Sequence, residues 1–307
     1  MKMWFIGKNK KLIRAGNGVL IDPHCRRNTD RVRRTVEEFY KKYPFPEYDH
    51  DETIGTLIDK SRKRVFPELL NRALGFQDKV LEVGCGTGQL GNFLAISGRK
   101  VLSTDMCLAS LAAGQKFKRD HLLKSITFLQ GDLFNLPLKT NFFDAVICTG
   151  VLHHTDSAQK GYLSILRHLK KGGIIIVGLY NKYMRLPTMI RKPFFKAWGE
   201  KAAGLDPYLR VHNIRGKKKT AWIQDQYFHP HESTHSIDEV LRWFKETNVS
   251  FIRSIPSTIY GKELSLTQRE SLFDPVDPMT HAERLLVQIG NTFGNQEGGL
   301  FMVIGRK

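Results

Sequence analysis

Three glycines at alternate positions form the stretch of this sequence with the clearest chemical potential. Lys79–Gln89 begins as a short apolar strand pattern with one acid, Glu82, and then passes through Gly84, Gly86 and Gly88 into a helix-like pattern. A buried strand that turns on glycines into a helix brings backbone N–H groups and the positive helix end to a ligand, because no Cβ atom intervenes. The stretch predicts a small-molecule site.

The spacing of the glycines distinguishes two kinds of ligand. A dinucleotide fold has its third glycine one residue later, where it lets helix and strand pack closely. Glu82 would repel a pyrophosphate, but it would favour a ligand that carries an amino group and a sulfonium. Another nucleotide loop or a tight turn remains the alternative for this pattern alone.

The pattern E-x-G-x-G-x-G after a strand resembles motif I of the class I S-adenosylmethionine (SAM) methyltransferases. The resemblance implies SAM as the cofactor. It assigns to the cofactor site the residues of this loop: Glu82, Gly84, Cys85, Gly86 and Gly88.

Two acids at later strand ends occur in the order that this resemblance requires. Asp105 follows the glycine loop by about 20 residues, where a carboxylate can accept both ribose hydroxyls, and Met106 next to it can pack on the adenine. The resemblance implies that Asp132 takes the adenine amino group and that the backbone N–H of Leu133 meets a ring nitrogen. An aspartate at a strand end is otherwise a common turn or helix cap.

The segment Thr149–His154 after the fourth strand pattern resembles the corresponding segment of the ubiquinone/menaquinone-type (type 11) methyltransferases. In that group this backbone faces the methionine end of the cofactor, which assigns Thr149 to cofactor binding. His154 would then lie beside the entering methyl acceptor. We expect it to orient the acceptor rather than to act as a base.

The predicted bases lie in Asp225–His235. Imidazoles titrate near neutral pH, and this segment ends a long insertion just before a helix, so it can fold over the mouth of the sheet. Together with His154, the candidate catalytic residues are therefore Asp225, His229 and His231. Turn and cap histidines with local hydrogen bonds are the alternative. No metal is predicted, because His229, His231 and His235 lack an evident carboxylate or cysteine partner.

The elements that must position these residues alternate between strand and helix patterns from residue 65 onward, which predicts an α/β fold with a parallel sheet and helices on both faces. The family resemblance implies a seven-stranded Rossmann-like methyltransferase sheet whose last strand inserts antiparallel. The predicted strands are Val80–Val83, Lys100–Asp105, Ile126–Gln130, Asp144–Cys148, Ile174–Gly178, Ser250–Ser254 and Leu300–Ile304. The predicted helices between them are Gln89–Ile96, Leu108–Leu123 and Ser157–Leu169.

Residues 1–64 are predicted to form a basic N-terminal extension or lid, and residues 65–307 the methyltransferase domain. Within the extension, residues 10–22 predict a hairpin with a type I′ turn at Asn17-Gly18, followed by a basic helix, Thr29–Tyr40. Two prolines keep Tyr43–Tyr48 extended, so its aromatic rings can cover the cofactor or acceptor, or plug the edge of the core. The segment also resembles the N-terminal part of a group of bacterial methyltransferases.

A second extra segment, residues 180–235, is far longer than the ~2–6 residues of an ordinary connection. Its stretch Met184–Trp198 mixes bulky apolar and basic residues, which fits an interfacial segment, a substrate cover or a helix over the core. We expect this insertion to lie on the acceptor side of the domain.

A formal net charge of +18 predicts attraction to polyanions or anionic surfaces. RNA, an anionic membrane surface and acidic substrates all fit, as does a solvated basic surface. The four cysteines form no C-x-x-C pair and no apolar run approaches the ~20 residues of a membrane span. We therefore expect a cytoplasmic protein, with a peripheral membrane location left open.

The function predicted from the resemblance is transfer of the SAM methyl group to an O, N or C atom of a small-molecule or lipid-like acceptor, held by the aromatic segment and the insertion. The charge favours an RNA (tRNA) methyltransferase as the alternative, although Thr149–Leu152 stands where an Asn-Pro-Pro-Tyr-type loop would be. A non-catalytic SAM-binding partner protein is the second alternative.

Overall fold

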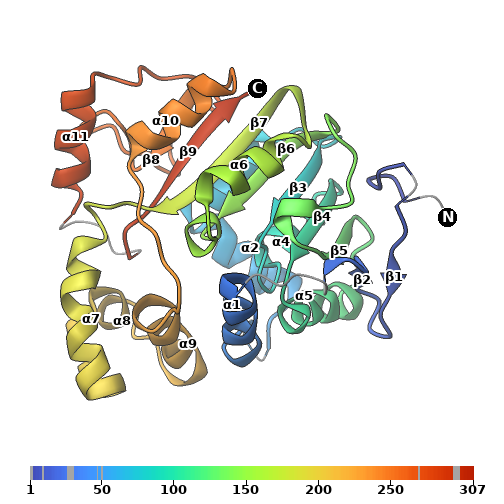
Figure 1. Cartoon of the computed structure of the whole chain (residues 1–307), viewed down its shortest axis with the longest axis horizontal. Helices are drawn as coiled ribbons and strands as arrows, with labels where there is room; N and C mark the ends of the chain where they lie inside the picture. Colours follow the sequence, from blue (N-terminus) through green and yellow to red (C-terminus); the bar gives the residue numbers. More distant parts are fainter. Residues whose placement is uncertain are drawn as a thin grey trace.

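The structure is a computed structural model that describes residues 3–8, 10–25, 31–46, 48–49, 51–268, 270–292 and 298–307. Its described residues include one nine-stranded sheet with the order β1-β2-β5-β4-β3-β6-β7-β9-β8 (Figure 1). The strands are β1 (Ile13–Arg14), β2 (Leu20–Ile21), β3 (Lys79–Val83), β4 (Lys100–Asp105), β5 (Ile126–Gln130), β6 (Phe143–Thr149), β7 (Leu169–Tyr180), β8 (Ser250–Ile255) and β9 (Leu300–Arg306).

The seven strands β5-β4-β3-β6-β7-β9-β8 match the seven that the sequence predicts. β5, β4, β3, β6 and β7 pair in parallel, and β9 runs antiparallel between β7 and β8. The expected antiparallel last strand is therefore confirmed. Glycine turns, caps and strongly apolar runs place most of these elements within two residues of their predicted ends, whereas β7 extends the predicted strand Ile174–Gly178 to Leu169–Tyr180. The helices predicted to reach Leu123 and Leu169 end earlier, at Asp120 and Leu166.

The prediction of seven strands is wrong by two, because the N-terminal hairpin joins the sheet. β2 pairs in parallel with β5, with Leu20 opposite Leu129. An edge strand presents unpaired N–H and C=O groups, which the hairpin satisfies. Strands of two residues are too short for hydrophobic alternation to reveal, so the sequence pattern does not show this attachment.

The hairpin itself forms as predicted, but its turn has three residues instead of two. Ile13 lies opposite Ile21, and the N–H of Ala15 donates to the carbonyl of Val19 at 2.8 Å. The loop is therefore residues 16–18, with Gly18 at φ +93°. That conformation suits glycine at the end of a three-residue hairpin loop.

Helices cover both faces of the sheet (Figure 1). α2 (Ile54–Arg62), α3 (Val65–Ala73), α4 (Gln89–Ile96) and α5 (Leu108–Asp120) pack in one apolar core with the inward side chains of β3 and β4. α6 (Ala158–Leu166) and α10 (Ile237–Glu246) pack in a second core on the other face. α11 (His281–Gly290) precedes β9. The carboxyl ends of the parallel strands stay available for a site, as in other open α/β sheets.

Two further groups of helices come from the N-terminal extension and from the insertion. α1 (Arg31–Lys42) contacts α5, and it contains the described part of the predicted basic helix; Thr29 and Asp30 lie outside the described residues. The insertion forms α7 (Leu186–Trp198), a 3-10 helix (Gly199–Leu205), α8 (Pro207–Val211) and α9 (Gly216–Tyr227), which share a small apolar cluster of their own. None of the helices in the described ranges is both long and apolar enough to cross a bilayer.

Candidate cofactor and acceptor site

The glycine loop follows β3 and adopts a left-handed backbone that only glycine occupies without strain. Gly84, Gly86 and Gly88 have φ values of +70°, +54° and +72°. A Cβ atom on Gly86 would also lie 2.3 Å from the carbonyl oxygen of Phe45, in the N-terminal aromatic segment. The sequence therefore needs glycine here both for the turn and for a close approach.

The described part of the aromatic segment lies directly across this loop. The hydroxyl of Thr87 donates to the carbonyl of Pro46, and the amide nitrogen of Asn92 on α4 donates to the hydroxyl of Tyr48 at 2.8 Å. Tyr48 also stacks on Phe117 of α5, with 5.0 Å between ring centroids. These contacts hold the segment against the same loop that the sequence assigns to the cofactor.

Asp105, at the end of β4, joins the glycine loop to its own strand. Its Oδ2 accepts the N–H of Gly86 at 2.8 Å and its Oδ1 accepts the N–H of Cys107 at 2.8 Å. Burial raises the pKa of this carboxyl to about 6. Met106 lies beside it, and the Met106 carbonyl accepts a bond from the amide of Gln130 at 2.9 Å. The carboxylate is thus held in place at the edge where a sugar would bind.

Asp132, after β5, forms an ion pair with α1. Arg33 Nη1 lies 2.7 Å from Asp132 Oδ2, and the Arg33 guanidinium carbon lies 4.0 Å from the ring centroid of Phe134. The other oxygen of Asp132 accepts the N–H of Phe134 at 3.0 Å. Leu133 packs against the core, and its carbonyl accepts the hydroxyl of Ser164. α1 therefore lies over the adenine end of the expected site.

Three other predicted cofactor residues support the loop from within the protein. Glu82 accepts the hydroxyl of Ser103 at 2.7 Å, and its burial raises the pKa of its carboxyl to about 7. Cys85 has its side chain in the core, and its N–H donates to the carbonyl of Thr104 at 3.0 Å. Thr149 ends β6 beside β7. All of these contacts are to groups of the protein itself. In this structure Glu82 therefore helps to shape the loop.

A second group of polar side chains, which we call the acceptor-side cluster, brings together α1, the 3-10 helix Leu152–His154, β7, α9 and the segment after α9. It consists of Tyr40, His154, Tyr180, Asp225 and His229. Asp225 is buried, and its oxygens accept the hydroxyls of Tyr40 at 2.9 Å and Tyr180 at 3.4 Å. Burial raises the pKa of both tyrosines, so they remain protonated donors to this carboxylate.

His154 and His229 stack with 3.6 Å between ring centroids and have opposite tautomers. Nδ1 of His154 lies 2.8 Å from the carbonyl oxygen of His231, so Nδ1 carries the proton and Nε2 keeps a lone pair. Nδ1 of His229 accepts the N–H of His231 at 3.2 Å, so Nε2 of His229 carries the proton. Burial lowers the pKa of each ring to about 3. The pair offers one acceptor nitrogen and one donor nitrogen, both uncharged.

The other histidines of the region make mostly local bonds. His231 donates from Nε2 to the carbonyl of Thr155 at 2.9 Å, outside the acceptor-side cluster, so its contribution there comes from its backbone. His235 bonds Ser233 and Glu239. Across the described ranges of the chain, no group of three or more His, Cys, Asp or Glu side chains is arranged to hold a metal ion.

The sequence reasoning missed four residues of this edge: Arg33, Tyr40, Tyr180 and Arg185. Arg185 is 1% exposed; it forms a two-point ion pair with Glu232, at 2.9 and 2.7 Å, and its guanidinium lies 3.8 Å from the ring centroid of Tyr180. No local pattern marks these residues, because each gains its role from a partner more than 40 positions away.

Part of the chain is similar to a known family. A family model described as a methyltransferase domain matches residues 81–177. A protein of Synechococcus sp. whose name states no function is 24% identical over 302 residues, with 84% of this chain and 72% of that protein covered. The ubiquinone biosynthesis O-methyltransferase of Rickettsia canadensis is 30% identical over 104 residues, with 34% of this chain and 43% of that enzyme covered. The chain thus spans less than half the length of the ubiquinone-pathway relatives it matches.

Solved structures share the fold at low sequence identity. PKMT2 from Rickettsia typhi has a TM-score of 0.57 at 13% identity, with 80% of this chain and 53% of that chain covered. Geranyl diphosphate C-methyltransferase from Streptomyces coelicolor, solved with Mg²⁺, geranyl diphosphate and S-adenosyl-L-homocysteine, has a TM-score of 0.52 at 14% identity, with 91% and 98% covered. These likenesses establish the Rossmann-like architecture with its mostly parallel sheet.

Proposed function

We propose that this chain, whose residues 81–177 match a methyltransferase domain model, is a class I, SAM-dependent methyltransferase that transfers the methyl group of SAM to an O, N or C atom of a small-molecule or lipid-like acceptor. One observation carries the proposal: α1 contacts both halves of the edge. Arg33 binds Asp132 on the cofactor side, and Tyr40 binds Asp225 in the acceptor-side cluster. Arg33 and Tyr40 are seven positions apart in the helix, which is about two turns and roughly 10 Å on one face.

The residues at the cofactor side fit SAM. Gly84 and Gly86 of the glycine loop are partly exposed, and Asp105 presents a partly buried carboxylate one strand away. In this proposal Asp105 accepts the ribose hydroxyls, and Met106, Asp132 and Leu133 meet the adenine. The backbones of Gly84–Gly88 and Thr149 then surround the methionine part. SAM itself supplies a methyl group on a sulfonium, which is an activated leaving group.

The acceptor-side cluster supplies positioning and a proton acceptor. Nε2 of His154 takes the proton of the acceptor atom, and the Nε2–H of His229 holds that atom in place. A low pKa does not prevent this step, because the proton on an oxygen or nitrogen becomes strongly acidic as the new bond to carbon forms. Asp225 and its tyrosines orient the cluster. Alignment of reacting atoms can contribute ~7–11 kcal/mol, which is most of what methyl transfer requires from a protein.

The surroundings of the cluster favour an amphipathic acceptor. Phe39 packs on His229 with 4.9 Å between ring centroids, and Phe45 approaches Trp222 of α9 at 6.3 Å, so aromatic rings of the N-terminal segment meet the insertion. We assign the acceptor pocket to these two segments. One relative is named as an O-methyltransferase of ubiquinone biosynthesis, and one protein of the same fold is named as a geranyl diphosphate C-methyltransferase.

Transfer of labelled methyl from SAM into fractionated cell extract tests this function. We expect the label in the lipid or small-molecule fraction. Label in RNA would instead support the tRNA methyltransferase, for which the net charge of +18 is the argument. Tight SAM binding with no label in any fraction would support a non-catalytic binding protein.

Replacing Arg33 by Ala is expected to strengthen SAM binding by up to about fivefold. The Arg33–Asp132 pair is partly exposed, and such pairs contribute ~0–1 kcal/mol. In the wild-type protein the adenine amino group must compete with Arg33 for Asp132, and the substitution removes this competition. Calorimetric titration with SAM measures the change. Arg34→Ala, one residue along the same helix, is the control. Weaker binding by Arg33→Ala would mean that the guanidinium belongs to the cofactor site.

A further inference from the structure

α7 carries apolar side chains on its outward face. Thr188 and Phe195 are its buried residues, so they mark the side of α7 that packs on the rest of the protein. Large apolar residues on the rest of the helix are exposed: Leu186 (46%), Met189 (50%), Ile190 (68%), Phe194 (42%) and Trp198 (58%). α7 lies at the edge of the molecule, away from the sheet (Figure 1). We call these five residues the α7 stripe.

The spacing of the α7 stripe fits a helix that lies flat on an apolar phase. At 3.6 residues per turn, Leu186 and Ile190 point opposite Phe195, with Met189 and Phe194 on either side of them. Lys192 and Lys196 follow one flank of the stripe. An aliphatic and aromatic face bordered by lysines is typical of interfacial helices, whose lysines reach the headgroups while the apolar face enters the acyl boundary.

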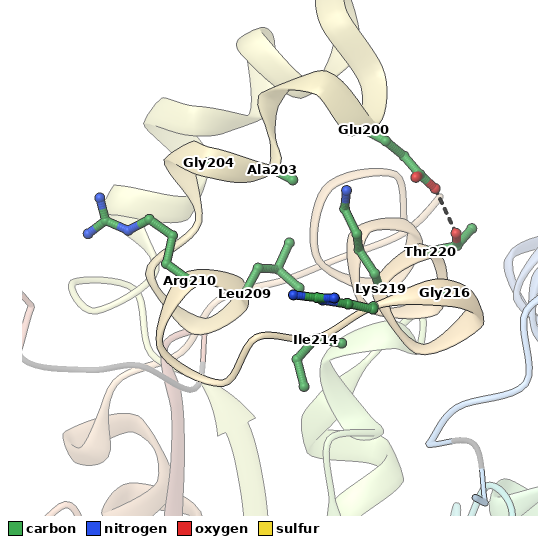
Figure 2. A pocket seen from close by; sticks show the side chains of 10 residues that line it. Glu200, Ala203, Gly204, Leu209, Arg210, Ile214, Gly216, Lys219 and Thr220 are labelled. Carbon is green, nitrogen blue, oxygen red and sulfur yellow. Dashed lines mark hydrogen bonds between the residues drawn. The ribbon is translucent and has the colours of Figure 1, made fainter. Parts of the chain in front are cut away.

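Positive charge is concentrated in the segment that contains this helix. Between Lys182 and Lys219 there are eleven Lys and Arg residues and two acids, so this segment carries half of the net charge of +18. A cavity of about 470 Å³ opens between the 3-10 helix, α8 and α9, and its lining includes Arg210, Arg215 and Lys219. Figure 2 shows this cavity with Arg210 and Lys219 labelled. Its one acid, Glu200, bonds the hydroxyl of Thr220 at 2.6 Å. A surface that combines cationic and apolar residues fits a lipid with an anionic headgroup and apolar acyl chains.

We propose that the insertion docks the protein on an anionic lipid bilayer through the α7 stripe and the basic residues around it. The lipid is favoured over a second copy of the chain, because two surfaces of this charge repel each other. RNA would neutralise the lysines but would leave the aliphatic face exposed. The inference deepens the proposed function, and it rests on that function where it explains how a lipid-like acceptor reaches the site. Docking itself can be measured without methyl transfer.

Vesicle sedimentation with the full chain tests the proposal. We expect binding to vesicles of phosphatidylglycerol and phosphatidylcholine in equal parts, and little binding to phosphatidylcholine alone or at high salt. Ile190→Glu is expected to weaken binding at least about tenfold, because it removes an aliphatic group that enters the acyl boundary and adds a negative charge. Leu286→Glu on α11 is the matched control, since Leu286 is 69% exposed, close to the 68% of Ile190.

Several outcomes would overturn the proposal. These are wild-type protein that ignores the anionic vesicles, Ile190→Glu that binds them as well as wild type does, and a wild-type oligomer that Ile190→Glu converts to a monomer. Stronger binding to tRNA than to vesicles at equal salt would also overturn it, because RNA would then be the partner of the basic surface. SAM titration of each variant separates the two hypotheses: intact SAM binding with failed docking leaves the proposed function standing.

Discussion

Replacing His154 by Asn is expected to lower kcat by about 10²–10⁴-fold. The amide nitrogen of Asn can reproduce the bond that Nδ1 makes to the carbonyl of His231 at 2.8 Å, whereas the lone pair at Nε2 is lost. The variant therefore removes the proposed proton acceptor and keeps the local structure. SAM affinity should stay within about twofold, because the charge and hydrogen bonds of the cofactor side are untouched. Steady-state kinetics with the acceptor found by labelling, together with SAM titration, measure both quantities.

His168→Asn is the matched control for this substitution. His168 is equally buried, its Nδ1 bonds the carbonyl of Lys139 at 2.9 Å, and burial lowers its pKa to about 4. It lies beside the start of β7, at the other end of the sheet from the acceptor-side cluster. Equal losses of kcat in the two variants would mean that His154 has only a packing role.

The pH profile gives an independent readout of the same group. Burial lowers the pKa of His154 to about 3, so its unprotonated form is present throughout the range from about pH 5 to 8. We therefore expect the kcat of the wild-type protein not to change in that range through titration of His154. A fall in kcat with a midpoint near 6.5 would contradict a buried, neutral His154.

The second large effect is expected at the cofactor: Asp105→Asn should weaken SAM binding by about a hundredfold. A carboxylate that accepts two ribose hydroxyls makes charge-assisted bonds of ~1.5–3 kcal/mol each, and the amide can accept only one of them. Its charge is also lost. Calorimetric titration with SAM at pH 8 measures the loss, and an unchanged affinity would exclude Asp105 from ribose binding.

The affinity of the wild-type protein for SAM should fall as the pH decreases through about 6. Burial raises the pKa of Asp105 to about 6, and the protonated carboxyl is a weaker acceptor for the hydroxyls. The dependence should be shallower in Asp105→Asn. Glu82 titrates nearby with a pKa of about 7, but it remains in both proteins, so the difference between their profiles isolates Asp105.

Unfolding is not expected to explain the effect of Asp105→Asn. The folded-state pKa of Asp105 is raised above its ordinary value, so the folded protein binds more protons than the unfolded chain, and the free energy of unfolding decreases as pH rises through about 6. A neutral amide avoids that penalty at pH 8, which offsets the one backbone bond, from Gly86 or Cys107, that the amide nitrogen cannot accept. Asp277→Asn is the control, because Asp277 makes the same kind of turn bond, to the N–H of Met279 at 2.7 Å, away from the site.

Much of this protein follows from local sequence. Apolar runs bounded by glycines and charges predict β3 to β9, and Lys100–Asp105, Ile126–Gln130 and Gln89–Ile96 form with their predicted ends. The glycine loop needs residues without a Cβ, so its position and left-handed backbone are also readable. Because parallel strands end at one edge, the order of Asp105 and Asp132 along the chain predicts that both reach the same site.

Only the tertiary structure decided what covers that site. The attachment of β2 to β5, the contacts of α1 with Asp132 and Asp225, and the stacked rings of His154 and His229 all join segments distant in sequence. Their physical basis is pairing and packing between surfaces, for which no residue pattern of one segment specifies the partner. The tautomers of the two histidines depend in turn on backbone groups of His231 that the fold brings to them.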